Sequence, residues 1–239
     1  RLYGKFDYYR REVDNLLFSV KVPQPPYTQG SQMQNIGSME SKGWEFEVGG
    51  DIIRTKDFTW SSSMNLSHNT GKILTLEGDN SYHNGNGFVA PGTPGDAARM
   101  EAGSTIGSFY MWKFAGFDDE GSFLLYNKDG EVIPAAQKTE NDKQYIGNYT
   151  PKLIIGWSHT LTYKNFDLGI NLRSWIDFDV YNTINMYYGI QGQGNLNVLK
   201  DAYGKFNHIK GEKQICDYFL EDGTFLKIDA ITLGYTLPM

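Results

Sequence analysis

Residues 42–69 read KGWEFEVGGDIIRTKDFTWSSSMNLSHN, and apolar and polar side chains alternate along this stretch. Trp44 and Phe46 are each followed by a glutamate, and after the polar RTKD segment the alternation resumes through Trp60 and Leu66. Because successive side chains of a β-strand point to opposite faces, each half predicts a strand with one apolar and one polar face. The polar segment between the halves predicts a tight turn, so the stretch is expected to form a β-hairpin.

The same period of two continues elsewhere and predicts an all-β chain. A second tight turn is expected near Lys164. The predicted long strands cover about 1–10, 42–53, 57–69, 152–163, 166–178 and 223–236 of a single partial barrel domain, 1–239. The connections between the other strands are long, at about 11–41, 70–151 and 180–222. Short turns at one end and long loops at the other are typical of outer-membrane barrels.

Composition narrows the class of protein. The formal net charge of −6 and the pI near 5.2 leave no basic footprint, so nucleic acid is not expected as a partner. Cys216 is the only cysteine, which excludes an intramolecular disulfide and a cysteine-based metal cluster. No run approaches the ~18 apolar residues of a membrane helix. The mean hydropathy of −0.47 fits a barrel whose inner face and loops are polar.

The number of predicted spanning strands indicates that the chain is a segment of a larger barrel. The short hairpin within 105–127 is expected outside the membrane, because its second arm is shorter than the ~9 to 11 residues of a spanning strand. Six spanning strands are too few, since the smallest outer-membrane barrels have about eight. An open sheet would also leave backbone groups unpaired in lipid. We therefore expect a segment of a large antiparallel transmembrane β-barrel with long extracellular loops.

At this point the ordered motifs resemble a known family. The segment NIGSMESKGWEFEV resembles the N-x-G-x-x-x-N-K-G-x-E block of SusC/RagA-type TonB-dependent transporters, outer-membrane nutrient importers of Bacteroidetes. The matching positions are Asn35, Gly37, Lys42, Gly43 and Glu45. Further blocks follow in family order over nearly the whole chain, ending in TFLKIDAITLGYTLP. Ser41 and Thr105 depart from the asparagine and proline that the family usually has there.

The resemblance implies a function as well as a fold. It implies a barrel of about 22 strands in the whole protein, placed in the bacterial outer membrane. The plug and the TonB box would precede residue 1, and the closing strands would follow residue 239. It further implies import of a large nutrient through TonB, with a SusD-like lid lipoprotein over the mouth and no enzymatic activity. An oligosaccharide is the favoured substrate, and a peptide importer of the same family is an alternative.

Three sets of side chains are candidates for contacts. Lipid is expected on the apolar faces, at Trp44, Phe46, Val48, Trp60, Leu66, Trp157, Leu168, Ile170 and Leu172. Candidate ligand contacts on the opposite, lumen-facing side are Asn171, Arg173, Trp175 and Asp177. Candidate contacts to substrate or lid in the last long loop are Tyr187, Tyr188, Gln191 and Gln193. Amides, charges and aromatic rings suit sugars, but they suit a water-filled wall equally well.

No catalytic, metal or cofactor site is expected. The acidic turns at 118–121 and 127–130 faintly resemble calcium loops, but their glycines do not fit the EF-hand spacing. No motif therefore supports calcium binding at these turns, and the sequence does not exclude it. The alternative from another class is a soluble or surface-attached β-sandwich module for carbohydrate binding or adhesion. In that case Trp44, Trp60 and Trp157 would meet in its interior.

Overall fold

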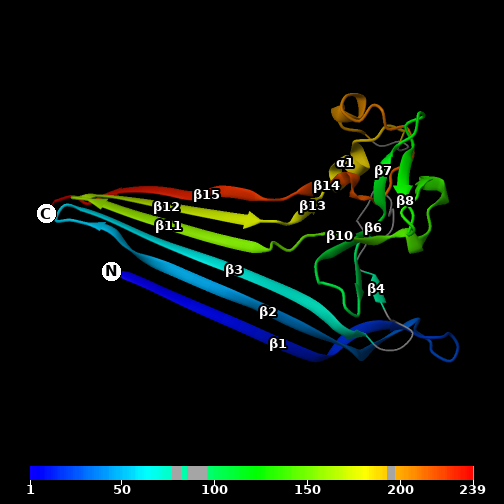
Figure 1. The fold of residues 1–239 in the computed structure, drawn as a ribbon, viewed down its shortest axis with the longest axis horizontal. Coiled ribbons are helices and arrows are strands. Elements are labelled where there is room, and N and C mark those ends of the chain that lie inside the picture. The colour runs from blue at the N-terminus through cyan, green and yellow to red at the C-terminus, as the bar shows by residue number, and fades with distance from the viewer. Residues whose placement is uncertain (77–81, 85–95, 193–196, 239) are drawn as a thin grey trace.

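One antiparallel sheet of six long strands dominates the computed structural model, which describes residues 1–76, 82–84, 96–192 and 197–238. The strand order is β1-β2-β3-β11-β12-β15, and both termini lie at the end of the sheet away from a compact head (Figure 1). Their bounds are Leu2–Lys21 (β1), Ser31–Arg54 (β2), Phe58–Leu76 (β3), Leu153–Tyr163 (β11), Phe166–Ile176 (β12) and Phe225–Tyr235 (β15). In the described part of the chain, β1 and β15 form the two open edges.

The predicted tight turns join neighbouring strands of this sheet. Between β2 and β3 the turn is closed by the Thr55 backbone N–H, which donates to the Phe58 carbonyl at 2.8 Å. Between β11 and β12 Lys164 takes φ 52°, a left-handed conformation that suits a two-residue hairpin turn. The pairing of β12 with β15 slips between Asn171 and Leu172, where Asp229 is the extra residue. This bulge lies beside Ala230, where the sequence loses its alternation.

The first three strands are much longer than the sequence predicts. β1, β2 and β3 contain 20, 24 and 19 residues, whereas β11, β12 and β15 contain 11 each. The segment 11–41, expected to be a loop, is mostly strand, with β1 and β2 paired out to Lys21 and Ser31. The sequence pattern does not reveal this extension, because Asn15, with a φ of 59°, forms a bulge that interrupts the period of two.

The described parts of the other two long connections, 96–148, 179–192 and 197–222, pack together into what we call the head. The sequence predicts long connections there with one short hairpin within 105–127, and residues 113–117 and 123–126 do pair as an antiparallel hairpin, whereas the other short elements of both segments were not predicted. The only α-helix in the described residues is α1, Thr183–Tyr188. The short strands are Tyr82–Asn84 (β4), Arg99–Glu101 (β5), Ser108–Met111 (β6), Lys113–Phe117 (β7), Phe123–Tyr126 (β8), Val132–Pro134 (β9), Gln144–Asn148 (β10), Asp179–Tyr181 (β13) and Leu220–Asp222 (β14). The 3₁₀ turns in the part of the chain that the structure describes are η1 (Ala135–Gln137), η2 (Glu140–Asp142), η3 (Lys200–Tyr203) and η4 (Asp217–Phe219).

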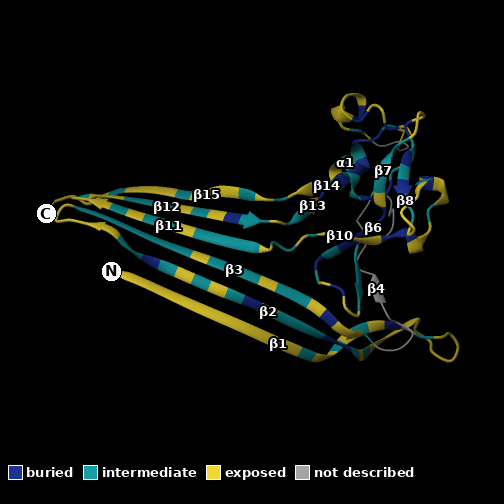
Figure 2. Ribbon diagram, viewed as in Figure 1, coloured by how far each residue is buried: buried dark blue, intermediate teal, exposed yellow. Residues whose placement is uncertain are grey.

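Burial separates the head from the sheet. Dark blue, buried residues gather in the head, whereas β1 is exposed over most of its length (Figure 2). The main hydrophobic cluster is drawn entirely from the head: Ala97, Phe109, Met111, Trp112, Phe123, Leu125, Ala135, Tyr181, Met186, Tyr187, Ile190, Phe206, Ile209, Ile215, Cys216 and Phe219. The sheet, in contrast, is a single layer, and Leu233 on it is 74% exposed. The β-sandwich alternative is therefore wrong, because the tryptophans of the sheet do not meet inside a two-layered core.

Among the described residues, none of the helices combines the length and the apolar character that a bilayer crossing requires.

Candidate functional site

Register places most apolar side chains of the six strands on one side of the sheet, which we call the apolar face. Residues that pair directly across antiparallel strands point to the same side. Val48 pairs with Met64, which pairs with Trp157, which pairs in turn with Leu172. The nine side chains expected to face lipid all lie on this face: Trp44, Phe46, Val48, Trp60, Leu66, Trp157, Leu168, Ile170 and Leu172. Their contact with lipid itself stays a prediction.

Aromatic rings close the apolar face at both ends. At the end with the tight turns, Phe58, Tyr163, Phe166 and Tyr235 form one row across four strands. At the head end, Tyr8, Trp44 and His68 form a second row, with the Trp44 and His68 rings 6.1 Å apart. The rows are ten residues apart on β3, which corresponds to ~33 Å along a strand and ~25 Å in height when tilted. A band of this height between two aromatic girdles is typical of barrel strands in a bilayer.

The indole N–H groups of Trp60 and Trp157, inside the apolar band, find their acceptors within it. The Trp60 indole Nε1–H donates to His159 Nδ1 at 3.3 Å, and the Trp157 Nε1–H donates to Ser62 Oγ at 2.9 Å. His159 also packs against Trp157, with their ring centroids 4.5 Å apart. These bonds matter because hydrocarbon offers no alternative partner to an exposed N–H group.

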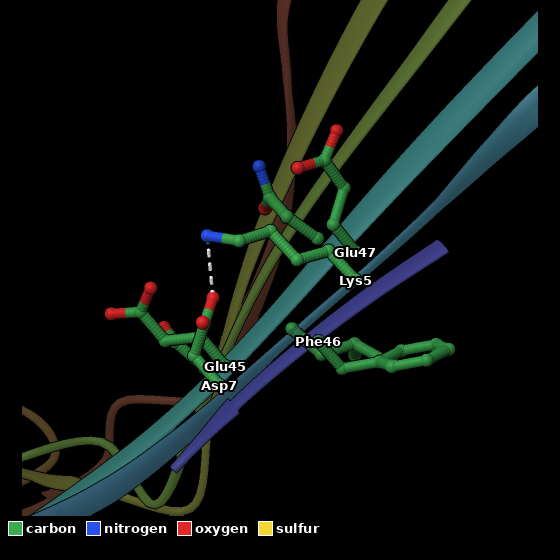
Figure 3. Close-up of a pocket in the computed structure, with 8 residues that line it drawn as sticks. Lys5, Asp7, Glu45, Phe46 and Glu47 are labelled. Carbon is green, nitrogen blue, oxygen red and sulfur yellow. Dashed lines mark ion pairs between the residues drawn. The ribbon is translucent and has the colours of Figure 1, made fainter. Parts of the chain in front are cut away.

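The opposite side, which we call the polar face, carries charges, hydroxyls and amides. Figure 3 shows Lys5, Glu45 and Glu47 projecting from one side of the strands while the Phe46 ring projects from the other. A groove of about 340 Å³ lies here. Its lining residues are Lys5, Asp7, Glu45, Phe46, Glu47, Asn65, Leu66 and Ser67. Lys5 Nζ and Asp7 Oδ2, two residues apart on β1, form an ion pair at 2.6 Å, so charged side chains line this part of the polar face.

Three of the four candidate lumen contacts share this polar face. Asn171 pairs with Ser158, Arg173 with Gly156 and Trp175 with Ile154. The Arg173 guanidinium lies 5.8 Å from the centre of the Trp175 ring, and its Nη2 donates to Asp229 Oδ1 at 3.2 Å. The Trp175 ring also contacts the rings of Phe225 and Phe178, at 5.6 and 5.9 Å between centroids. Trp175 is half-buried as a result, with Arg173 beside it.

Asp177 does not belong to that row, which corrects the sequence prediction. β12 ends at Ile176, and Asp177 takes φ 58°, which breaks the alternation of faces. Its Oδ2 accepts a bond from Lys152 Nζ at 2.7 Å, and its backbone N–H donates to Thr224 Oγ1. Asp177 therefore sits in the junction between sheet and head.

The candidate contacts of the last long loop are mostly internal to the head. The Tyr187 side chain is only 2% exposed and belongs to the main hydrophobic cluster, so it offers no surface to a ligand. Tyr188 is half-buried, and its carbonyl accepts from the Leu199 backbone N–H. Gln191 Nε2 donates to the Ala202 carbonyl at 2.6 Å and to Asn207 Oδ1 at 2.8 Å. Gln193 lies outside the described residues.

Two other side chains of this segment present surface that the sequence did not single out. Ile184 on α1 is 61% exposed, and Tyr203 on η3 is 69% exposed. Nothing in the local sequence distinguishes Tyr203 from the buried Tyr187. Which aromatic ring points outward is decided by how the two long connections pack.

In the acidic turns at 118–121 and 127–130, side-chain oxygens accept hydrogen bonds from nearby backbone N–H groups and so fix the turn conformation. Asp118 Oδ1 accepts from the N–H groups of Glu120 and Ser122, at 3.0 and 2.7 Å. Asn127 Oδ1 accepts in the same way from Asp129 and Glu131. These are Asx turns. Over the described ranges no group of His, Cys, Asp or Glu side chains gathers with metal-binding geometry.

Asp217 links the two long connections of the head through a partly buried hydrogen bond. Its Oδ1 accepts from the Phe114 backbone N–H at 2.6 Å, and burial raises the pKa of this carboxyl above its ordinary value. A raised folded-state pKa adds stability below the unfolded-state value and loses it as the pH rises through the folded-state value.

We therefore expect the head to become more stable relative to an Asp217→Asn variant as the pH falls from 7 toward about 4. The asparagine keeps an oxygen that accepts from Phe114 but does not titrate, so the difference between the two proteins isolates Asp217. Hydrogen exchange of the Phe114 amide in both proteins measures it. An unchanged difference across this pH range would contradict the assignment.

Comparisons with known proteins agree with this geometry. A family model described as "TonB dependent receptor-like, beta-barrel" matches residues 1–182. The chain is 30% identical over 261 residues to TonB-dependent receptor P3 of Formosa agariphila, covering 100% of this chain and 26% of that protein. It is 30% identical over 250 residues to TonB-dependent receptor SusC of Bacteroides thetaiotaomicron, covering 99% of this chain and 24% of that one.

Solved structures give the same fold. The structure of the RagAB peptide transporter superposes with a TM-score of 0.75 at 24% identity, over 100% of this chain and 27% of that chain. The RagAB peptide importer in its "open-open" state superposes with a TM-score of 0.77, also at 24% identity, over 100% of this chain and 26% of that chain. The chain thus spans about a quarter of the length of the relatives that it matches.

Proposed function

Because the chain belongs to the TonB-dependent receptor-like β-barrel family of outer-membrane proteins, we propose that it forms part of the wall of a transporter that imports a large nutrient, with an oligosaccharide as the substrate. The observation that carries the proposal is the division of one sheet into two faces. An apolar band closed by two aromatic rows faces outward to lipid, and a charged, hydroxyl-rich face lines the lumen. No bond-making chemistry is asked of these residues.

The proposal assigns the parts of the molecule to the two sides of the membrane. The tight turns at Thr55 and Lys164 lie on the periplasmic side, and the head lies outside the cell. A SusD-like lipoprotein covers the mouth beside the head and holds the substrate. In this proposal TonB supplies the energy for import. Ile184 and Tyr203 are the exposed head residues best suited to such a lid contact.

An oligosaccharide suits the polar face because sugars present many hydroxyl groups and apolar ring faces. Ser63, Ser158 and Asn171 form one row of hydroxyl and amide groups across three strands. Trp175 adds an aromatic ring and Arg173 a cation beside it. Such groups bind hydroxyls and stack on sugar rings without requiring a charged ligand.

The test is uptake of fluorescent oligosaccharides and fluorescent peptides by cells that carry the full-length transporter and its lid. Trp175→Ala is expected to reduce oligosaccharide uptake about fivefold, the equivalent of about 1 kcal/mol of lost stacking. Trp175→Phe keeps a ring and is the matched control, expected to retain most of the uptake. Saturable uptake of peptides but not of oligosaccharides would overturn the substrate while leaving the transporter intact. Absence of TonB-dependent uptake of both would overturn the function.

A further inference from the structure

Just beyond the head-end aromatic row, the apolar face changes abruptly into a charged surface. Arg10 and Glu12 of β1, Glu40 and Lys42 of β2, and Lys72 of β3 replace the rings, and we call these five residues the outer charged patch. Arg10 pairs with Lys42, Glu12 with Glu40, and Glu40 with Lys72. On each strand they continue the alternation of Tyr8, Trp44 and His68 without a bulge, so they lie on the same face as the apolar band.

Ion pairs hold the cations of the patch in place. Arg10 Nε donates to Glu40 Oε2 and Arg10 Nη2 to Glu12 Oε1, each at 2.5 Å. Lys42 Nζ lies 3.6 Å from the other oxygen of Glu40. The Glu40 side chain is only 12% exposed, whereas those of Arg10 and Lys42 are 58% and 53% exposed. The Glu40 carboxylate is therefore largely covered, whereas the Arg10 and Lys42 side chains that pair with it stay exposed to solvent.

The position of the patch fixes what can reach it. Arg10 and Lys42 each lie two residues past an aromatic ring, or ~7 Å along the strand. This is where the polar interface begins beyond the ~30 Å hydrocarbon core. The patch lies on the lipid side, so cargo in the lumen cannot contact it. Arg11 and Ser41, at the same height, point to the opposite side.

The charge of the patch opposes that of the chain. Three cations stand against two carboxylates in the patch, whereas the chain as a whole carries a net charge of −6. Arg10 and Lys42 are direct cross-strand neighbours, whose Cβ atoms lie ~5 Å apart, which allows both head groups to reach one phosphate. Guanidinium and ammonium groups are the side chains that bind phosphate oxygens best.

We infer that the outer charged patch binds the phosphate groups of lipid headgroups in the outer leaflet of the membrane. Glu12 and Glu40 orient Arg10 and Lys42 toward the bilayer interface, and Lys72 adds a third cation at the edge of the patch. The aromatic row at Tyr8, Trp44 and His68 lies directly below, where it contacts the start of the acyl chains. The inference rests on the orientation of the apolar face proposed above.

The experiment uses the full-length transporter in phosphatidylcholine nanodiscs doped with phosphatidic acid, whose headgroup is a phosphate monoester. Native mass spectrometry counts the phosphatidic acid molecules that stay bound. The double variant Arg10→Gln/Lys42→Gln is expected to lower their affinity roughly 25-fold, from the loss of two cations near the surface. Arg11→Gln removes one positive charge from the opposite face, one residue from Arg10, and is expected to bind like the wild type.

Further arms separate the sources of phosphate and the ways of failing. Inorganic phosphate is expected not to displace the lipid, because only a headgroup is anchored beside the patch; displacement would overturn the lipid as the ligand. Lys72→Gln alone is expected to cause a smaller loss of affinity for phosphatidic acid. This single variant tests the inference if the double variant does not fold. Equal affinity of the double variant and Arg11→Gln for phosphatidic acid would overturn the inference. So would a wild type that shows no preference for phosphatidic acid over phosphatidylcholine. If uptake is normal in either case, the proposed function stands. Failure of the wild type to insert would overturn the proposed function as well.

Discussion

Leu172→Arg is expected to prevent stable insertion of the full-length protein into a bilayer, whereas Asn171→Arg, one residue away, is expected to insert normally. Leu172 lies on the apolar face near the middle of the band, in one row with Trp157 and Met64. Arginine at the midplane of a lipid-facing strand costs about 2 to 4 kcal/mol. Asn171 points to the polar face, where an arginine stays in water beside Arg173 and Asp229.

Refolding of the two full-length variants into lipid vesicles measures the effect, through the fraction that migrates as folded barrel without heating. Because the pair differs only in which face receives the charge, general effects of an added arginine cancel. Equal folding of both variants, or a greater defect in Asn171→Arg, would contradict the assignment of faces. That result would remove the physical basis for the transporter and for the lipid site together.

Phe123→Ala is expected to destabilise the head by about 3 to 5 kcal/mol while leaving the sheet intact. The Phe123 side chain is 1% exposed and contacts the rings of Phe117, Tyr218 and Phe219, at 4.9, 5.9 and 6.2 Å between centroids. Truncation leaves a cavity between residues of both long connections. Since every member of the main cluster belongs to the head, the loss should not spread into the six-stranded sheet.

Hydrogen exchange of the intact protein, read by mass spectrometry, separates the two regions. Amides of β8 and η4 are expected to exchange faster in Phe123→Ala, whereas those of β11 and β12 keep their protection. Val132→Ala on the neighbouring strand β9 is the control, because Val132 is 52% exposed and should change stability by less than about 0.5 kcal/mol. Parallel loss of protection in the sheet would show that head and sheet unfold as one unit.

The faces of the sheet could be predicted because they depend on local sequence alone. Alternation along a strand specifies which side chains share a side, and this placed Trp44 with Phe46 and Asn171 with Arg173 before any fold was known. The same rule failed at Asn15 and Asp177, where a left-handed residue adds or removes half a period. Near Asn15 the predicted strand ended too early, at Arg10, whereas β1 continues to Lys21. Near Asp177 the predicted strand ended too late, at 178, whereas β12 ends at Ile176.

Apart from the short hairpin of β7 and β8, the head could not be predicted, because its core joins segments that are far apart in the chain. The bond from the Phe114 N–H to Asp217 spans 103 residues, and Trp112 pairs as an isolated bridge with Cys216. Glycine-rich, polar connections without a clear period look like loops, and only their mutual packing buries enough apolar surface to order them. Tyr187 was therefore expected at the surface and is in the core.

The amino-acid sequence by itself determined the two-faced sheet, its tight turns and, through ordered motifs, its membership in a family of outer-membrane transporters. Only the tertiary structure decided how far β1 to β3 extend past the aromatic row, which residues fold into the head, and which charged residues lie on the apolar face beyond that row. The reason is physical. A side chain's face on a strand follows from its neighbours in sequence, whereas burial, cross-strand pairing and depth follow from residues that only folding brings together.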